Sequence, residues 1–236
     1  MTSGYLYLIP VPLGENAPLT LIPEETRRVA SRLRSFIAEE PKNARRFLKR
    51  LGFATQLQEI EILSLNEHTL AEGLPRLIVP LLEGKSIGLM SDVGCPAVAD
   101  PGAELVRMAH EHGVAVVPLT GPSAILLALM ASGLNGQRFS FRGYLPADKA
   151  SRIAKIRELE RDSRSSDETE IFIETPYRNQ HLFDSLLETC RQQTRLCLAV
   201  DLTLATEFIR TMTIQQWSAK PPELGKRPAV FLLYSG

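Results

Sequence analysis

The feature that most constrains the fold is a regular alternation of short apolar runs with stretches of helical periodicity. In the first half of the chain, apolar runs predict strands over 5–9, 60–65, 86–90 and 114–117. Helical spacing, with Pro, Glu and Gly near the expected ends, predicts helices over 23–38, 43–51, 70–82 and 103–112. Such an alternation indicates βαβ units, and therefore an α/β fold with a largely parallel sheet.

The same alternation begins again after Pro118. Strands are predicted over 138–144, 170–173, 196–201 and 229–234, and helices over 123–132, 149–161 and 179–191. The polar segment 162–168 is expected to be a loop. A chain of 236 residues is long enough for two domains, and the turn at 119–122 is the natural place to divide them. We therefore expect two α/β domains, 1–118 and 119–236.

Composition excludes several classes of protein. Lys plus Arg and Asp plus Glu number 27 each, so the chain is not evenly basic, and a 44% hydrophobic content is too high for a disordered protein. Three cysteines without a CxxC pair favour reduced thiols over disulfides or a zinc site, so no metal is expected. No apolar run approaches the ~20 residues of a membrane span. These features predict a soluble cytoplasmic protein.

The segment from Ser91 to Gly102 directly follows a predicted strand. In open α/β sheets, ligands bind beside the carboxyl ends of strands, and this segment holds turn residues between two aspartates, Asp92 and Asp100. A purely structural interpretation is also open, in which Asp100 caps the helix that follows. From the pattern alone, the two interpretations are equally supported.

Three further segments lie at strand exits or helix starts. They are Thr120–Ala124, Glu174–Arg178 and Val200–Glu207. Free amides at a helix start can bind a ligand, but a tight turn with a helix cap is the better explanation of the first segment taken alone. The other two are ordinary strand exits when taken alone. The chain contains neither GxGxxG nor GxxxxGK[ST], so neither a dinucleotide fingerprint nor a P-loop is present.

The order of these segments along the chain is more informative than any one of them. A strand followed by Pro-x-Pro-x-Gly precedes Ser-Asp-x-Gly-x-Pro-x-x-x-Asp-Pro-Gly, and then come Gly-Pro-Ser-Ala, Gly-Tyr-Leu-Pro and Glu-Thr-Pro-Tyr-Arg. This succession resembles the tetrapyrrole methylase superfamily, the class III S-adenosylmethionine-dependent methyltransferases. Within it, the chain looks most like the branch that methylates small-subunit ribosomal RNA. The resemblance covers nearly the whole chain and is most specific over 84–146.

The resemblance implies two α/β domains, a homodimer, and S-adenosylmethionine in a cleft between the domains. It also explains the missing dinucleotide fingerprint, which this superfamily does not use. Carried over by matching position, the residues beside the cofactor would be Pro12, Met90, Ser91, Asp92, Cys95, Ser123, Ala124, Glu174, Thr203 and Ala229.

The chain departs from the superfamily's usual pattern mainly on the substrate side. The usual Arg-Glu-Leu-Thr-Lys is Val-Asp-Leu-Thr-Leu over 200–204, which lacks both cations, and the usual Glu-Asp-Thr-Arg is Glu-Glu-Pro-Lys over 39–42. The cofactor half of the pattern is better kept. Methyl transfer is therefore a firmer expectation than any particular acceptor.

Two basic clusters bear on the substrate. Residues 27–50 hold nine Lys or Arg and two Glu, a density that favours contact with nucleic acid over a merely solvated helix face. Residues 138–161 hold seven basic and three acidic residues and are interpreted as ordinary surface.

The leading hypothesis is a methyltransferase that modifies a ribose hydroxyl of small-subunit ribosomal RNA. A hydroxyl nucleophile calls for a base, and the candidates are Asp92, Asp100, Glu67 and His68, although His68 alone is better explained as a structural polar residue. One alternative keeps the cofactor and changes the acceptor to a tetrapyrrole, another small molecule or a protein side chain. Another is a catalytically silent homologue that binds cofactor or RNA.

Overall fold

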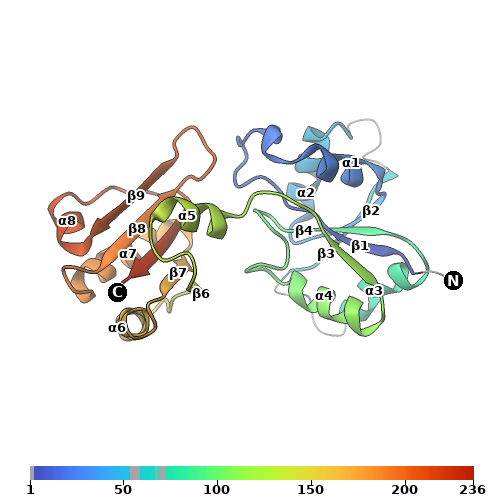
Figure 1. Ribbon diagram of the computed structural model, residues 1–236. Helices are drawn as coiled ribbons and strands as arrows, with labels where there is room; N and C mark the ends of the chain where they lie inside the picture. The colour runs from blue at the N-terminus through green and yellow to red at the C-terminus, as the bar shows by residue number, and fades with distance from the viewer. Residues whose placement is uncertain (1–2, 54–58, 67–68, 70–72) are drawn as a thin grey trace. The chain divides into compact units, whose positions relative to one another are not determined.

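The computed structural model describes residues 3–53, 59–66, 69 and 73–236. The chain divides into two compact units, Met1–Ser123 and Ala124–Gly236, each with its own five-stranded sheet (Figure 1). The division at residue 123 lies slightly beyond the boundary at 118 that the sequence predicts.

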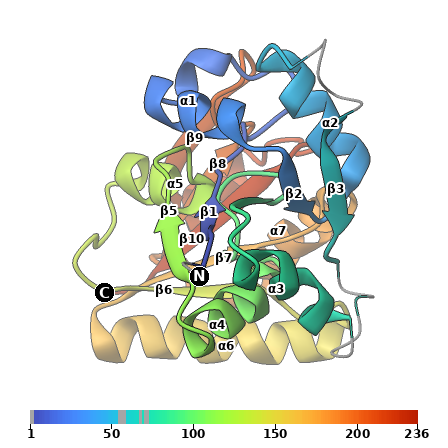
Figure 2. The ribbon, with the colours of Figure 1, turned by 90° about the vertical axis from the view of Figure 1, so that its right-hand side faces the viewer.

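The sheet of the first unit is entirely parallel. Its strands are β1 (Tyr5–Leu8), β2 (Ser35–Ala38), β3 (Glu61–Ser64), β4 (Ile87–Met90) and β5 (Ala115–Pro118). They lie in the order β3-β2-β4-β1-β5, with β1 between β4 and β5. Figure 2 shows β5 and β3 at the two edges of this sheet. Parallel neighbours need a crossover connection, which the intervening helices supply. The α/β class predicted from the alternation is confirmed for this unit.

Helices cover both faces of this sheet. They are α1 (Glu24–Arg32), α2 (Pro41–Arg50), α3 (Leu74–Leu82) and α4 (Gly102–Glu111), and a short 3₁₀ turn η1 (Leu19–Leu21) precedes α1. Neighbouring strand residues point to opposite faces, so Phe36 packs in the cluster under α1 and α2, and Ile37 in the cluster under α3 and α4. Figures 1 and 2 both show these two pairs on opposite sides of the sheet.

The sheet of the second unit is mixed. Its strands are β6 (Phe139–Tyr144), β7 (Thr169–Ile173), β8 (Arg195–Val200), β9 (Phe208–Thr213) and β10 (Ala229–Tyr234), in the order β6-β7-β10-β8-β9. Only β6 and β7 pair in parallel, and the other neighbours are antiparallel. The expectation of a largely parallel sheet is therefore wrong here, because an apolar run shows that a strand is buried but not its direction.

One large core holds the second unit together. Its helices are α5 (Ala124–Ser132), α6 (Lys149–Ser166), α7 (Asn179–Thr189) and α8 (Ile214–Ala219), with a 3₁₀ turn η3 (Pro176–Arg178) before α7. Residues of α6, α7 and α8 pack with β7, β8 and β10 in a single buried cluster. At its centre Trp217 meets the ring of Phe183 edge-on and donates its indole N–H to the carbonyl of Leu196 at 2.9 Å.

The helix expected over 23–38 is too long. The helix α1 ends at Arg32, Leu33 has extended backbone angles, and residues 35–38 form β2. Phe36 and Ile37 are fully buried on opposite faces of the sheet, so this strand has an unbroken apolar run rather than an alternating one. A short run of that kind cannot be told from a helix segment by periodicity.

The loop expected over 162–168 is mostly helical. The helix α6 continues to Ser166 and ends at Asp167, which has the left-handed conformation common just after a helix. Ser163 is completely buried and donates its hydroxyl to the carbonyl of Glu168 at 2.7 Å. The polar run is thus held by hydrogen bonds that its composition does not reveal. Two further elements, β9 and α8, lie where the sequence patterns predict neither strand nor helix.

Candidate functional site

The loops that leave three strands of the first unit, β1, β4 and β5, pack tightly together. After β1, the amide of Val11 donates to the carbonyl of Gly94, beyond β4, at 2.9 Å. After β5, Gly121 lies so close to Pro10 that an added Cβ would stand 2.3 Å from the proline Cβ. Only glycine fits there, and the loops form one surface at the carboxyl edge of the sheet, where α/β proteins bind ligands.

Asp100 holds the loop that follows β4. Its Oδ1 accepts hydrogen bonds from the amides of Ala97 and Gly102, both at 2.8 Å, while Ala97 and Ala99 have left-handed backbones. Burial raises the pKa of the Asp100 carboxyl, and the two amide hydrogen bonds act in the opposite direction. These contacts give Asp100 the role of shaping the loop and starting α4.

Asp92 lies in a different setting, on the wall of an open hollow of about 200 Å³. Asn43 from the first turn of α2 donates its side-chain N–H to Asp92 Oδ2 at 3.0 Å. Within the described residues the other carboxylate oxygen, Oδ1, makes no hydrogen bond, so it is available to a ligand. We call this cavity the α2 hollow; it is lined by Val11, Pro12, Gly14, Glu15, Asn43, Ala44, Arg46, Phe47, Arg50, Ser91, Asp92 and Val93.

The α2 hollow brings together residues from two separate predictions. Pro12, Ser91 and Asp92 come from the predicted cofactor set, and Arg46 and Arg50 come from the basic cluster. Arg50 is fixed because its guanidinium donates to the carbonyl of Glu15 at 2.7 Å and that of Ala17 at 2.6 Å. Arg46 is exposed, and among the described residues its one ion pair is a solvent-facing contact with Glu15 at 3.4 Å, which leaves it free to meet an anion.

Other predicted residues of the first unit have less direct access to a ligand. The side chain of Met90 is buried in the core, so only its backbone could face a bound molecule. Cys95 is half-buried, its thiol donates to the carbonyl of Pro122 at 3.5 Å, and burial raises its pKa, so it stays protonated. Ser123 lies at the end of the unit, and Ala124 begins α5. Glu67 and His68 lie outside the described residues.

In the second unit, Glu174 follows β7 and is almost fully buried. Its Oε1 accepts four hydrogen bonds, from the amide and hydroxyl of Thr175 and from two guanidinium nitrogens of Arg178, at 2.6–3.1 Å. Its Oε2 is buried without any hydrogen-bond partner among the described residues. A buried carboxylate oxygen left unpaired is costly, so this atom is a candidate to accept a hydrogen bond from a ligand.

Two more buried polar atoms near the same sheet edge share this property. They are Thr203 Oγ1, after β8, and Asn179 Oδ1, at the start of α7, neither of which has a hydrogen-bond partner in the described part of the chain. Ile173 pairs with Val230 and Val200 with Ala229, so the exits of β7 and β8 flank the start of β10. The predicted residues Glu174, Thr203 and Ala229 thus meet at one edge.

The turn after β8 has an unusual backbone. Asp201 and Thr203 both have left-handed conformations, with φ of 51° and 70°, which cost free energy in residues other than glycine. The Asp201 carboxylate holds the turn by accepting from Arg227 at 2.6 Å and from the Thr206 hydroxyl at 2.7 Å. Asn179 joins the same network by donating to the Arg227 carbonyl at 2.7 Å.

Two residues of these sites, Asn43 and Asn179, are not predicted by any sequence pattern. A single asparagine in the first turn of a helix forms no recognisable sequence motif. Each of these two matters here because the fold places it beside the end of a strand. Among the described residues, no cluster of three or more His, Cys, Asp or Glu side chains could hold a metal ion, and no helix is long and apolar enough to cross a membrane.

Comparison with known proteins identifies the family to which this chain belongs. Residues 6–217 match the family of Tetrapyrrole (Corrin/Porphyrin) Methylases. The chain belongs to the tetrapyrrole methylase family. This places it among the S-adenosylmethionine-dependent methyltransferases, as the order of its sequence motifs predicts.

Several relatives of this tetrapyrrole methylase are named ribosomal RNA small subunit methyltransferase I. The relative from Mesorhizobium japonicum is 35% identical over 89% of this chain and 67% of its own length. Those from Vibrio cholerae and Escherichia coli O157:H7 are 32% and 30% identical over 97% and 100% of this chain, and 76% and 79% of their own lengths.

Solved structures agree on the fold. The methyltransferase CobJ superposes with a TM-score of 0.64 at 17% identity, over 99% of this chain and 94% of its own. A uroporphyrin-III-C-methyltransferase from Thermus thermophilus gives 0.56 at 18% identity, over 98% and 92%. The two-unit α/β architecture is therefore that of the tetrapyrrole methylases.

Proposed function

We propose that this protein transfers the methyl group of S-adenosylmethionine to a ribose hydroxyl of small-subunit ribosomal RNA. The observation that carries the proposal is the α2 hollow, in which Asp92, Arg46 and Arg50 share one cavity at the ligand-binding edge of the sheet. The relatives named for this activity, which match nearly the whole chain, support it.

The α2 hollow provides what an RNA hydroxyl needs. Guanidinium groups at Arg46 and Arg50 attract the phosphates on either side of a target ribose. Asn43 holds Asp92 by one oxygen and leaves the other free to accept the proton of the hydroxyl. The protein's main task is alignment, because holding the two reacting groups together removes much of the entropic barrier to transfer.

The residues of the second unit fit the cofactor. The adenosyl group of S-adenosylmethionine carries an amine and two hydroxyls. The three buried atoms without partners among the described residues, on Glu174, Asn179 and Thr203, can all accept hydrogen bonds from such donors. S-adenosylmethionine supplies an electrophilic methyl group bonded to a sulfonium sulfur, and this sulfur leaves as a neutral thioether when the methyl group is transferred. The rest of the cofactor site stays a prediction, and so does the expectation that both units contribute to it. The residues predicted for it are Pro12, Met90, Ser91, Asp92, Cys95, Ser123, Ala124 and Ala229.

The test is transfer of a labelled methyl group to RNA. The full chain is incubated with radiolabelled S-adenosylmethionine and small-subunit ribosomal RNA, and the product is digested with alkali. Alkaline cleavage needs a free 2′-hydroxyl, so label on a ribose stays in dinucleotides, whereas label on a base is released in mononucleotides. We expect label in dinucleotides.

Other outcomes separate the alternatives. Label in mononucleotides would refute the ribose assignment. Absence of transfer to RNA, with transfer to a tetrapyrrole, would favour a small acceptor, and cofactor binding without any transfer would indicate a silent homologue. An enzyme acting on ribosomal RNA would work in the cytoplasm, as the composition of the chain predicts. The expected homodimer is checked by light scattering of the purified chain.

A further inference from the structure

The C-terminal half of α6 carries a row of arginines beside a second cavity. Arg157, Arg161 and Arg164 are spaced four and three residues apart, which places them on one face of the helix. With Arg191, which follows α7, and Glu160 they line a hollow of about 290 Å³. All four arginines are exposed. We call this cavity the arginine hollow.

A buried carboxylate lies within the same face of α6 as the row. Glu160 is 9% exposed, and its Oε1 accepts hydrogen bonds from the amide of Arg191 at 2.7 Å and the hydroxyl of Thr194 at 2.5 Å. These bonds tie the segment between α7 and β8 to α6. They thereby hold Arg191 at the edge of the same cavity as the arginines of α6.

The arginine hollow keeps a net positive charge, because its lining holds four guanidinium groups and one carboxylate, that of Glu160. The guanidinium groups of Arg157 and Arg191 make no hydrogen bond or ion pair with any described residue. Arg161 has one distant partner, Asp162 at 3.6 Å, in an exposed pair, and such pairs are weak. Arg164 donates only to neutral groups of Ser235, at 3.2 and 3.5 Å. The donor forks of the guanidiniums are thus available to an anion.

We propose that the arginine hollow binds consecutive phosphates of an RNA chain. This inference rests on the proposed function, because it takes RNA as the substrate. Arginine pairs with phosphate through parallel hydrogen bonds. From Arg157 to Arg164 the helix rises about 10 Å at ~1.5 Å per residue, which is too long for one phosphate group and suits a run of them.

The arginine hollow is separate from the candidate cofactor residues of its own unit. Glu174 and Thr203 follow the carboxyl ends of β7 and β8, whereas Arg191 and Thr194 precede the amino end of β8. The two groups therefore lie at opposite ends of the same strand. An anchor at that distance would hold a large RNA without touching the methyl group, and would raise RNA affinity rather than the rate of transfer.

The test uses charge reversal in the full chain. The double variant Arg157→Glu/Arg191→Glu is compared with wild type and with Arg210→Glu, a single charge reversal on an exposed arginine of β9 that does not line the hollow. Binding of a fluorescein-labelled transcript of small-subunit ribosomal RNA is measured by anisotropy across a salt series, and S-adenosylmethionine affinity is measured by calorimetry.

We expect the double variant to bind the transcript about tenfold more weakly, with a log–log salt slope reduced by about 0.7–0.9 for each phosphate that the variant no longer binds. Cofactor affinity and the Arg210→Glu control should match wild type. If the charge-reversed protein fails to fold, Arg157→Gln/Arg191→Gln repeats the measurement with smaller expected changes in the same direction.

Two results would overturn the proposal. One is an affinity and a salt slope equal to those of wild type. The other is displacement of the transcript by millimolar inorganic phosphate at constant ionic strength, which would make the hollow a site for a single free phosphate. The proposed function is judged separately, because methyl transfer by wild type can succeed with an inert arginine hollow or fail while the hollow still binds RNA.

Discussion

At the scale of single residues, two aspartates of one loop differ in the hydrogen bonds that their carboxylates make. Asp100 directs one oxygen to two backbone amides and shapes the loop, whereas Asp92 keeps one oxygen free on the wall of the α2 hollow. The sequence offers both as candidates for the base. Only the hydrogen bonds around each carboxylate separate a structural aspartate from one that can take part in chemistry.

The first prediction concerns Asp92→Ala. Its carboxylate is half-buried and contributes little to packing, so we expect the melting temperature to stay within about 2 °C of wild type. Methyl transfer should fall by about 10²-fold or more, because a positioned base contributes on that order. Radiolabel transfer and thermal melting measure the two effects, with Asp184→Ala, an exposed aspartate on α7, as the control.

Either of two results would remove Asp92 from the site. An unfolded variant would give the residue a structural role. A folded variant with full transfer and full cofactor affinity would show that no ligand depends on its carboxylate.

At the scale of elements, the way α2 packs on the core determines which of its arginines line the α2 hollow. Ala44, Phe47 and Leu48 are buried against the first core, which turns Arg46 and Arg50 toward the α2 hollow and leaves Arg45 outside its lining. The density of basic residues is visible in the sequence. Which of them face the same cavity as Asp92 depends on how the helix packs.

The second prediction compares the arginines of α2. Replacing Arg45 and Arg46 together by Ala should weaken RNA binding and lower the log–log salt slope by about 0.7–0.9 for each phosphate no longer bound. Of the single variants, Arg46→Ala should account for the larger share, because Arg46 lines the hollow and Arg45 does not. Anisotropy titrations over a salt series test this, and identical behaviour of all three variants and wild type would make α2 an ordinary solvated helix.

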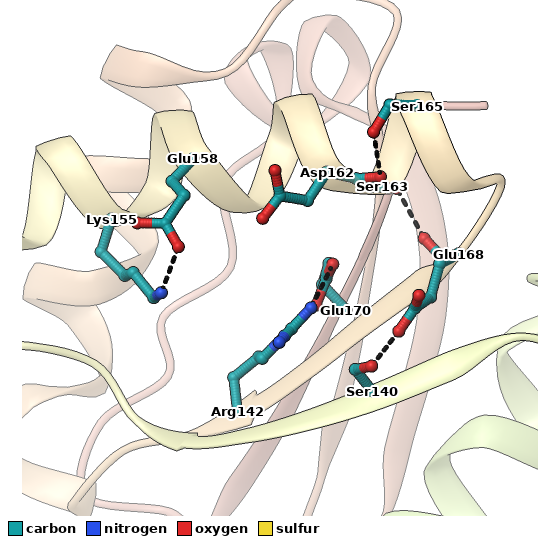
Figure 3. Close-up of polar contacts among 9 residues, drawn as sticks. All are labelled: Ser140, Arg142, Lys155, Glu158, Asp162, Ser163, Ser165, Glu168 and Glu170. Atoms are coloured by element: carbon teal, nitrogen blue, oxygen red, sulfur yellow. Dashed lines mark hydrogen bonds and ion pairs between the residues drawn. The ribbon is translucent and has the colours of Figure 1, made fainter.

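A third prediction follows from the polar contacts beneath α6 (Figure 3). Arg142 from β6 holds Glu170 on β7 through two hydrogen bonds, at 2.6 and 3.1 Å, and Glu170 is completely buried. Arg142→Ala would leave that carboxylate buried and unpaired, so we expect the free energy of unfolding to fall by about 3 kcal/mol. Urea denaturation measures it.

The control is Lys155→Ala, which breaks the solvent-facing Lys155–Glu158 pair drawn in the same figure. Exposed pairs contribute little, so this variant should unfold at the wild-type midpoint. Equal midpoints for both variants would mean that the buried pair adds nothing to stability.

The elements also show which parts of the fold a sequence can predict. Strands and helices are predictable where periodicity is strong, and the motif order identifies the family. The sequence of strand β2 resembles that of a helix segment because both faces of the strand are buried. The polar sequence at the end of α6 resembles that of a loop, although the buried Ser163 hydroxyl donates a hydrogen bond to the backbone there. Strand direction in the second sheet, and the contacts of Asn43 and Asn179, depend on tertiary structure that no local pattern encodes.

At the scale of the whole molecule, each of the two units carries its own set of candidate groups. The first has its own core, an open hollow with a free carboxylate oxygen, and basic side chains. The second has its own core and three buried polar atoms without partners among the described residues. Neither set alone provides acceptor binding together with recognition of a nucleoside. The expectation that both units contribute to the cofactor site stays a prediction.

The last prediction tests that expectation by hydrogen exchange of the full chain with and without S-adenosylmethionine. A ligand present at about 100 times its dissociation constant stabilises the protein that binds it by about 2.7 kcal/mol. If the cofactor contacts both units, amides should gain protection after β4, around Ser91 and Asp92, and after β7 and β8, around Glu174 and Thr203. Amides beside the arginine hollow, such as Arg191, should exchange as before. Protection confined to one unit would restrict the cofactor site to that unit and remove the other unit's residues from it.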